Sequence, residues 1–301
     1  MNKNNSKLIY FVAAILWGAS YAIQKPLLDF IDPVVFTFWN FFLSGLAFLL
    51  YAIVKKIPLT YRWREGIILG VFVSGMEIFE MIGLKMTSSA NTVFLTNLGM
   101  LIIPYVSWLF YKGKVKTEDG IAILLAVVGM YMLVGGLTGF TVGDGILLVS
   151  ALASAFYFIY SERFEAERAR HITTLCVQQF FVISLICLAW GLFAGLPFAI
   201  HGASLQFELL WQIVLFTTIP YAIIQWASRY ADEMIAAIYD GVVEPLTGAI
   251  LAWVILSEAT TPLKISGGIL MLISFLFASL FSKRHFLQHS ILSLFISKPK
   301  K

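Results

Sequence analysis

Residues 233–258 read EMIAAIYDGVVEPLTGAILAWVILSE. The 24 residues between the two terminal glutamates are almost all apolar, and a helix of about that length crosses ~30 Å of hydrocarbon. Asp240 and Glu244 lie inside the stretch, four residues apart and so on one face of a helix, and Pro245 follows. Because a carboxylate at the bilayer centre costs about 2.5–3.5 kcal/mol, both acids are expected to face protein or water. The stretch therefore predicts a membrane helix that forms one wall of a polar cavity.

The composition is that of an integral membrane protein. Of 301 residues, 59% are hydrophobic and only 13% charged, with a mean hydropathy of +0.86, whereas soluble domains carry roughly 25% charged residues. The net charge of +4 comes from basic residues in short loops, which does not indicate a nucleic-acid partner. All four histidines fall in loops or in the tail, so we expect no metal site within the membrane, and no motif indicates a cofactor.

Ten apolar runs are long enough to span a bilayer, which predicts an all-α integral membrane protein of ten transmembrane helices. Residues 1–7 form a short N-terminus before them. The tail 283–301 is too short to span, and its apolar residues between basic ends suit either an interfacial helix or a frayed terminus. The runs are 8–24, 33–54, 66–84, 90–111, 118–136, 144–161, 172–195, 209–228, 234–257 and 264–282.

The basic residues predict the orientation of these spans. If the N-terminus is cytoplasmic, 18 of the 21 lysines and arginines fall inside, and only Lys25, Lys85 and Lys264 fall outside. This asymmetry is typical of the positive-inside rule. We therefore expect both termini to lie in the cytoplasm of a cell with the protein in its plasma (inner) membrane.

The two halves of the chain repeat one another weakly. WNFFLSGL at 39–46 in the second run matches QQFFVISL at 178–185 in the seventh. Because each copy holds an odd number of spans, the second copy, 143–282, must enter the membrane inverted relative to the first, 8–136. Inverted repeats with a binding site at the midplane between them are a transporter architecture.

Two segments resemble a known family. VVEPLTGAILAWVILSE at 242–258 and GLKMTSSANTVFLTNLGMLIIP at 83–104 are similar to the ten-helix drug/metabolite transporter superfamily, in its EamA-type double repeat. The family often has Gly-Glu after the fourth span, where this chain reads Tyr111-Lys112-Gly113-Lys114. The resemblance, over residues 8–282, implies small-molecule transport, commonly export of amino acids, related metabolites or drugs, through a cavity between spans 1–5 and 6–10.

Four acids lie well inside the apolar runs, away from their ends. Glu77 and Glu80 are one turn apart near the middle of the third run, and Asp240 and Glu244 lie in the ninth. Buried acids brace helices when a base pairs with them, but no Lys or Arg falls at the middle of any run. We therefore predict that all four bind substrate or couple to protons. For Glu244, a conformational role at the Pro245 kink is the alternative.

Amides and aromatic rings are candidates for the lining of the same cavity. Buried amides equally serve as interhelical hydrogen-bond partners worth about 0.6 kcal/mol each, and aromatic rings either pack over a cation or simply fill the core. The cavity-lining candidates are Asn40, Asn97, Gln178, Gln179, Tyr157 and Tyr239. Glu258, at the end of its helix, is expected at the outer surface with no part in transport.

The sequence thus predicts a secondary transporter of a small polar metabolite, not an enzyme, that works by alternating access of its two halves. Four ionised, unpaired acids would cost on the order of 10 kcal/mol, so protons or a bound cation must neutralise them. We therefore expect an amine-bearing substrate (an amino acid, a polyamine or a cationic drug), its export, and coupling to protons. The alternatives are a channel, or a membrane-embedded enzyme that uses the carboxylates as acid and base.

Overall fold

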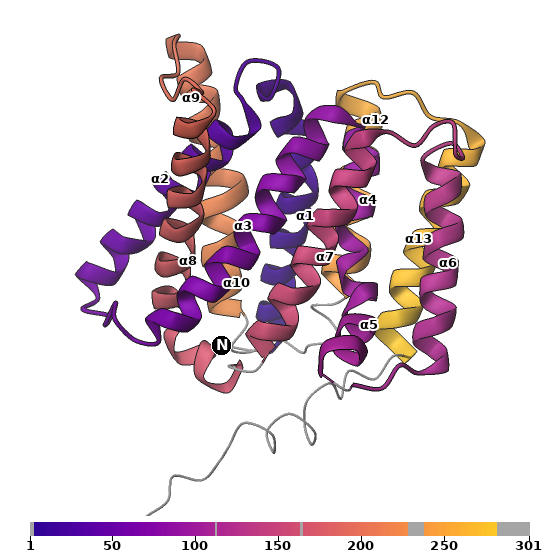
Figure 1. Ribbon diagram of the computed structural model, residues 1–301, viewed down its shortest axis with the longest axis horizontal. Coiled ribbons are helices and arrows are strands. Elements are labelled where there is room, and N and C mark those ends of the chain that lie inside the picture. The colour runs from indigo at the N-terminus through magenta and orange to yellow at the C-terminus, as the bar shows by residue number, and fades with distance from the viewer. Residues whose placement is uncertain (1–2, 112, 163–164, 228–237, 282–301) are drawn as a thin grey trace, which may run out of the picture.

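The structure is a computed structural model and describes residues 3–111, 113–162, 165–227 and 238–281. Within these ranges all regular elements are helices, which run back and forth between two ends of the molecule (Figure 1). We call the end that carries the N-terminus the proximal end and the opposite one the distal end. The interfacial helix considered for residues 283–301 lies outside the described residues.

Among the described residues, the first half of the chain has six helices and the second half has eight helical segments, of which η1 and η2 are π-helices. The first half holds α1 (Lys3–Leu27), α2 (Pro33–Val54), α3 (Trp63–Met86), α4 (Ser89–Asn97), α5 (Gly99–Tyr111) and α6 (Thr117–Leu133). The second holds α7 (Val142–Glu162), α8 (Glu165–Phe193), α9 (Ala203–Gln212), η1 (Ile213–Thr218), α10 (Ile219–Ala227), η2 (Tyr239–Val243), α12 (Glu244–Ile255) and α13 (Pro262–Phe281).

Local sequence signals explain where several helices begin and end. α2 starts after Asp32, whose Oδ1 accepts a hydrogen bond from the backbone N–H of Val34 at 2.8 Å, with Pro33 in the first turn. Gly135 and Gly136, at φ of 85° and 79°, follow the end of α6 in a backbone conformation that side chains disfavour.

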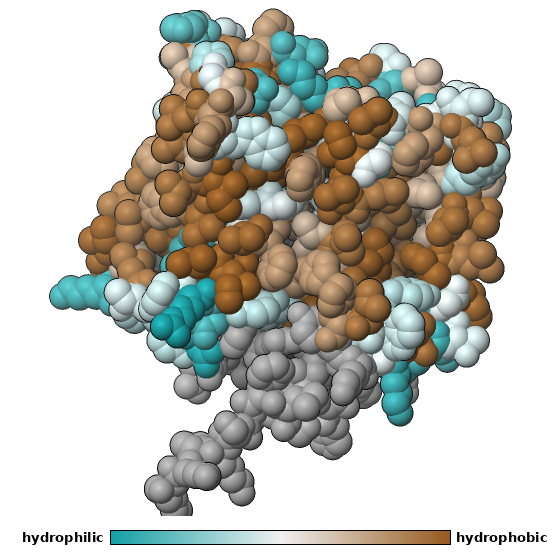
Figure 2. All heavy atoms as spheres, in the orientation of Figure 1, coloured by the Kyte–Doolittle hydropathy of each residue, from teal (hydrophilic) through white to brown (hydrophobic). Residues whose placement is uncertain are grey.

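Eight segments among the described residues are long and apolar enough to cross a membrane. The ten-helix architecture is completed by α6, which has 17 residues and packs along α13, and by η2 with α12, which follow residues 228–237. On the face that Figure 2 shows, apolar residues form a broad band across the middle and hydrophilic residues gather towards the two ends. That distribution is expected for a surface in contact with lipid.

Three of the predicted spans are interrupted, and a break was expected only in the ninth, at Pro245. The fourth divides at Leu98 into α4 and α5, the eighth contains η1, and the ninth passes through η2 before α12 begins. In η2 the backbone N–H of Glu244 bonds to the carbonyl of Tyr239, five residues back. Pro245 has no N–H to donate, so α12 begins beside it. π-helical turns occur often at functional sites, and hydropathy alone does not reveal them.

The packing follows the inverted repeat. α3 of the first half packs on α7 of the second. Their counterparts, η1 with α10 for α3 and α1 for α7, pack on one another in the same way. α7 packs on α4 and α5, and α1 correspondingly packs on η2 and α12. α2 with α8, and α6 with α13, pair each helix with its own counterpart. Exchange of the halves therefore maps the main helix contacts onto one another, as an inverted repeat requires.

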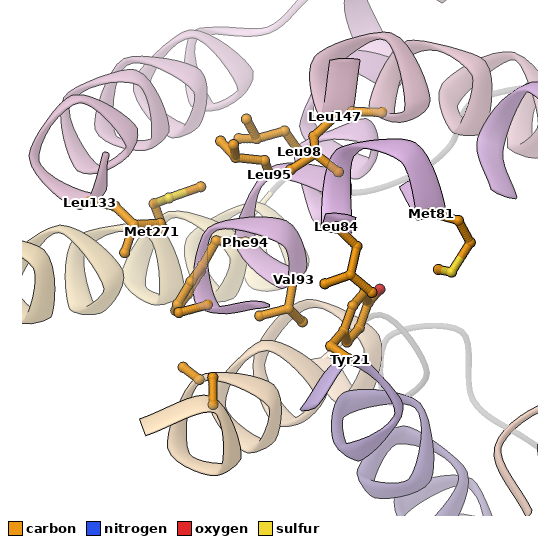
Figure 3. Close-up of a cluster of buried hydrophobic side chains, with 14 of the residues drawn as sticks. Tyr21, Met81, Leu84, Val93, Phe94, Leu95, Leu98, Leu133, Leu147 and Met271 are labelled. Carbon is orange, nitrogen blue, oxygen red and sulfur yellow. The ribbon is translucent and has the colours of Figure 1, made fainter. Parts of the chain in front are cut away.

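Two large apolar clusters form the core. One includes Tyr21, Leu84, Val93 and Met271 (Figure 3) and joins residues of α1 to α7, α9, η1, α12 and α13. The other joins α2, α3, α7 and α8 around Phe41 and Phe180. Since α3 contributes to both, its middle lies where the two clusters meet.

Candidate functional site

Three of the four predicted acids come together in the interior. Glu77 and Glu80 project from the middle of α3, and Glu244 begins α12 in the other half of the molecule. The charge of Glu80 interacts with both Glu77 and Glu244. Glu244 also interacts with Asp240, one turn earlier in η2. The structure thus brings Glu77 and Glu80 of one repeat near Glu244 of the other, with Asp240 one helical turn from Glu244.

Tyrosine hydroxyls are the main hydrogen-bond donors to these acids. Tyr221 of α10 donates to Glu77 Oε1 at 3.4 Å. On α1, Tyr21 donates to Glu244 Oε1 at 3.3 Å and Tyr10 to Asp240 Oδ2 at 3.4 Å. All three distances lie beyond the usual 2.5–3.0 Å for O–H···O bonds, so the hydroxyls hold the carboxyls only weakly.

Sequence reasoning missed the three tyrosines as partners, although α1 carries a signal. Tyr10, Trp17 and Tyr21 recur at intervals of seven and four residues, so they share one face of the helix. The ring of Trp17 meets that of Tyr221 edge-on with centroids 5.5 Å apart. The aromatic face of α1 therefore lies against the acids and against α10.

The acids of the cluster differ in their exposure. Glu77 and Glu80 are each partly exposed although they lie in the middle of α3, while Glu244 is buried, at 8% exposure. The partners of these acids belong to α1, α10 and α12, in the interior of the helix bundle. Glu77 and Glu80 are therefore partly accessible, although their partners come from helices packed in the interior.

No base neutralises Glu77, Glu80 or Glu244 within the described part of the chain. The one salt bridge found there joins Arg62 to Glu65 at 3.2 Å, near the proximal end. The ammonium group of Lys25, at the distal end of α1, donates hydrogen bonds to the backbone carbonyls of Leu84 and Thr87. Nor do the described residues include a group of three His, Cys, Asp or Glu side chains placed to hold a metal ion.

The six predicted lining residues divide into two groups. Asn97 Nδ2 lies 3.5 Å from Glu244 Oε1, and Tyr239 packs beside the rings of Tyr10 and Phe11 near Asp240. The others make helix-to-helix contacts in this structure. Asn40 accepts from Thr217, Tyr157 donates to Gln179, and Gln178 donates to the carbonyls of Leu59 and Tyr61 in the α2–α3 loop.

Comparison with known protein families identifies the family of this chain. A model of the EamA-like transporter family matches the chain twice, at residues 6–135 and 141–280. The chain belongs to the EamA-like transporter family.

Relatives of this EamA-like chain are named as transporters. An uncharacterized transporter of Archaeoglobus fulgidus is 27% identical over 89% of this chain and 84% of its own length. A transporter from Chlamydia muridarum named for S-adenosylmethionine and S-adenosylhomocysteine is 21% identical, over 84% of this chain and 85% of its own. One solved crystal structure, 17% identical, superposes with a TM-score of 0.66 over 94% of this chain and 99% of that one, which shows the shared fold.

Two further acids of this EamA-like protein have a different environment. Glu258, expected at the outer surface with no part in transport, accepts from the backbone N–H groups of Ser89 at 2.6 Å and Ala90 at 3.2 Å. It therefore caps α4, whose first N–H groups have no partner within the helix. Asp144, which is fully buried, accepts from Thr87 Oγ1 at 2.7 Å and from Asn91 Nδ2 at 3.0 Å. Sequence reasoning did not find these contacts, because they join residues far apart in the chain.

Proposed function

We propose that this protein is a secondary transporter that exports a small amine-bearing cation in exchange for protons. The observation that carries the proposal is the meeting of Glu77 and Glu80 from one repeat with Glu244 from the other. Such a site lies between the halves that move in alternating access. Crowded carboxyls that lack a basic partner are neutralised by either a proton or a cation, so the two compete for them.

The cationic substrate is favoured over a zwitterion by the position of Lys25. To bind an amino acid, the site needs a positive group that pairs with the carboxylate of the substrate. Lys25, at the distal end of α1, already donates hydrogen bonds to two backbone carbonyls. An amine without a carboxylate needs no such positive group in the site. A transporter related to this chain is named for S-adenosylmethionine, whose sulfonium is also a cation, so that compound belongs in the substrate panel.

The experiment is transport by the full chain reconstituted in vesicles with an imposed pH gradient. Diamines, monoamines, S-adenosylmethionine, neutral amino acids and dicarboxylates of similar size are compared. We expect saturable flux of the cationic amines that depends on the gradient and leaves the substrate chemically unchanged. Unchanged substrate separates the transporter from a membrane enzyme, and saturation separates it from a channel.

Variants link that flux to the acids. Glu77→Gln and Asp240→Asn should each lower gradient-driven amine flux by at least about tenfold, since each removes one exchangeable charge worth roughly 1.4 kcal/mol or more of cation binding. Glu65→Gln, on the same helix as Glu77 but paired to Arg62 near the proximal end, is the matched control and should retain flux. Gradient-independent dicarboxylate transport, unaffected by Asp240→Asn, would contradict the proposal.

A further inference from the structure

The turn between α3 and α4 is held by three charged side chains from three other helices. Lys25 of α1 donates to the carbonyls of Leu84 and Thr87 at the end of α3. Glu258, just beyond α12, accepts from the first N–H groups of α4, and Asp144 of α7 accepts from Thr87 and Asn91. We call the contacts of these three residues with the α3–α4 turn the distal clamp.

The clamp satisfies backbone groups that would otherwise lack partners. The last carbonyls of a helix and its first N–H groups have no bonds within it, and they favour a cation and an anion respectively. Lys25 and Glu258 supply these charges at the two adjoining helix ends, and the two side chains also attract one another. Ser89, Asn91 and Thr92 are all nearly or fully buried. Water is thus largely excluded from the start of α4 while the clamp is closed.

The clamp joins the two halves of the molecule. The α3–α4 turn belongs to the first repeat, whereas Asp144 and Glu258 belong to the second. The clamped elements also carry the acids, because α3 bears Glu77 and Glu80 and the segment ending near Glu258 begins at Glu244. Any motion that separates the halves at the distal end must therefore withdraw Asp144 and Glu258 from the turn.

We propose that the distal clamp closes the distal end of the transport pathway, and that its release is the step that exposes the acids there. Glu258 is thus a positioning residue, whose capping of α4 also holds Asn97 beside Glu244. The inference rests on the proposed transport by alternating access. The contrasting possibility is a static cap, in which the turn, Asp144 and Glu258 move together as one body.

Covalent closure distinguishes these possibilities. A Ser89→Cys/Glu258→Cys pair, in a background with Cys176→Ala and Cys187→Ala, is bridged by a short bifunctional thiol reagent. We expect bridging to reduce amine flux at least about tenfold and reduction of the bridge to restore it. The control pair, Ser204→Cys/Glu208→Cys, bridges two residues within α9 that already contact each other at 3.1 Å, and its flux should not change. Full flux through the bridged Ser89–Glu258 protein would overturn the clamp, while the unbridged protein reports separately on the proposed function.

A second measurement needs no substrate. Thr92→Cys, fully buried beneath the clamp, is exposed to a membrane-impermeant maleimide added at the distal side. We expect Glu258→Gln to increase the labelling rate about tenfold, which corresponds to about 1.4 kcal/mol of lost closure. Glu208→Gln removes an acid at the same end but outside the clamp, and should leave the rate unchanged. Equal rates in the two variants would show that Glu258 does not hold this end closed.

Discussion

Hydrogen-bond length separates two kinds of acid in this chain. Asp144 accepts bonds of 2.7 and 2.8 Å from Thr141 and 2.7 Å from Thr87, and Glu258 accepts one of 2.6 Å. Glu77 and Glu244 accept only bonds of 3.3–3.5 Å. Short hydrogen bonds to a carboxylate are the strong ones. Asp144 and Glu258 therefore stabilise the fold, whereas Glu77 and Glu244 can exchange their hydrogen-bond partners.

This difference predicts opposite effects on stability. Asp144→Asn turns one acceptor oxygen into a donor that faces other donors, and should lower the free energy of unfolding by about 1.5–3 kcal/mol. Glu77→Gln replaces a poorly compensated acid with an amide that is cheaper to bury, and should change it by less than about 1 kcal/mol. Thermal unfolding of the two purified variants in one detergent measures both. Similar melting temperatures for the two would contradict the distinction.

Some of these residues were predictable and others were not. The acids are visible in the sequence because a charge stands out within an apolar run, and their convergence follows from the inverted repeat. The partners of the acids are not visible, because which helices touch is a tertiary property. Glu258 and Ser89 lie 169 residues apart in the chain. No local sequence pattern predicts a helix cap from so distant a residue.

At the scale of elements, the close crossing of α1 and α12 positions the acidic cluster. A Cβ atom added at Gly18 would lie against the carbonyl of Glu244 and 2.9 Å from Thr247 Cβ. Small residues at such crossings let membrane helices pack backbone to backbone. Because Tyr21 follows Gly18 by one turn, the same crossing sets the distance from Tyr21 to Glu244.

Gly18→Ala should therefore force α1 and α12 apart. We expect a loss of about 1–3 kcal/mol in the free energy of unfolding, as for other overpacked sites, and reduced amine flux because Tyr21 leaves Glu244. Gly120→Ala in α6 is the control, since a Cβ there meets nothing within 4 Å and alanine favours helix. The prediction fails if Gly18→Ala unfolds at the same temperature as Gly120→Ala.

Hydropathy predicted the number and order of the spans but not their interruptions. The breaks at Leu98, in η1 and in η2 change the hydrogen-bond spacing without changing how apolar the segment is. In the ninth span Pro245 indicated an interruption, whereas the residues of η1 contain no comparable helix breaker.

At the scale of the whole molecule, the orientation of the bundle remains a prediction from charge. Leu137 is 83% exposed in the distal loop between α6 and α7, so Leu137→Cys in the cysteine-free background should react with an impermeant thiol reagent added to intact cells. Lys114→Cys, between α5 and α6 at the proximal end, should react only after the cells are permeabilised. The reverse pattern of labelling would place the N-terminus outside.

Glu258, which caps the start of α4, has no acidic match in the sequence at the opposite end. Glu258 follows the ninth span, whereas the fourth span is followed by Lys112, Gly113 and Lys114, with no acid before Glu118. Two identical halves would give inward-open and outward-open states of equal energy, and each 1.4 kcal/mol of asymmetry shifts their ratio tenfold. Under the proposed orientation and with the proposed clamp, we therefore expect the resting population to favour the inward-open state, in which an exporter would bind its substrate.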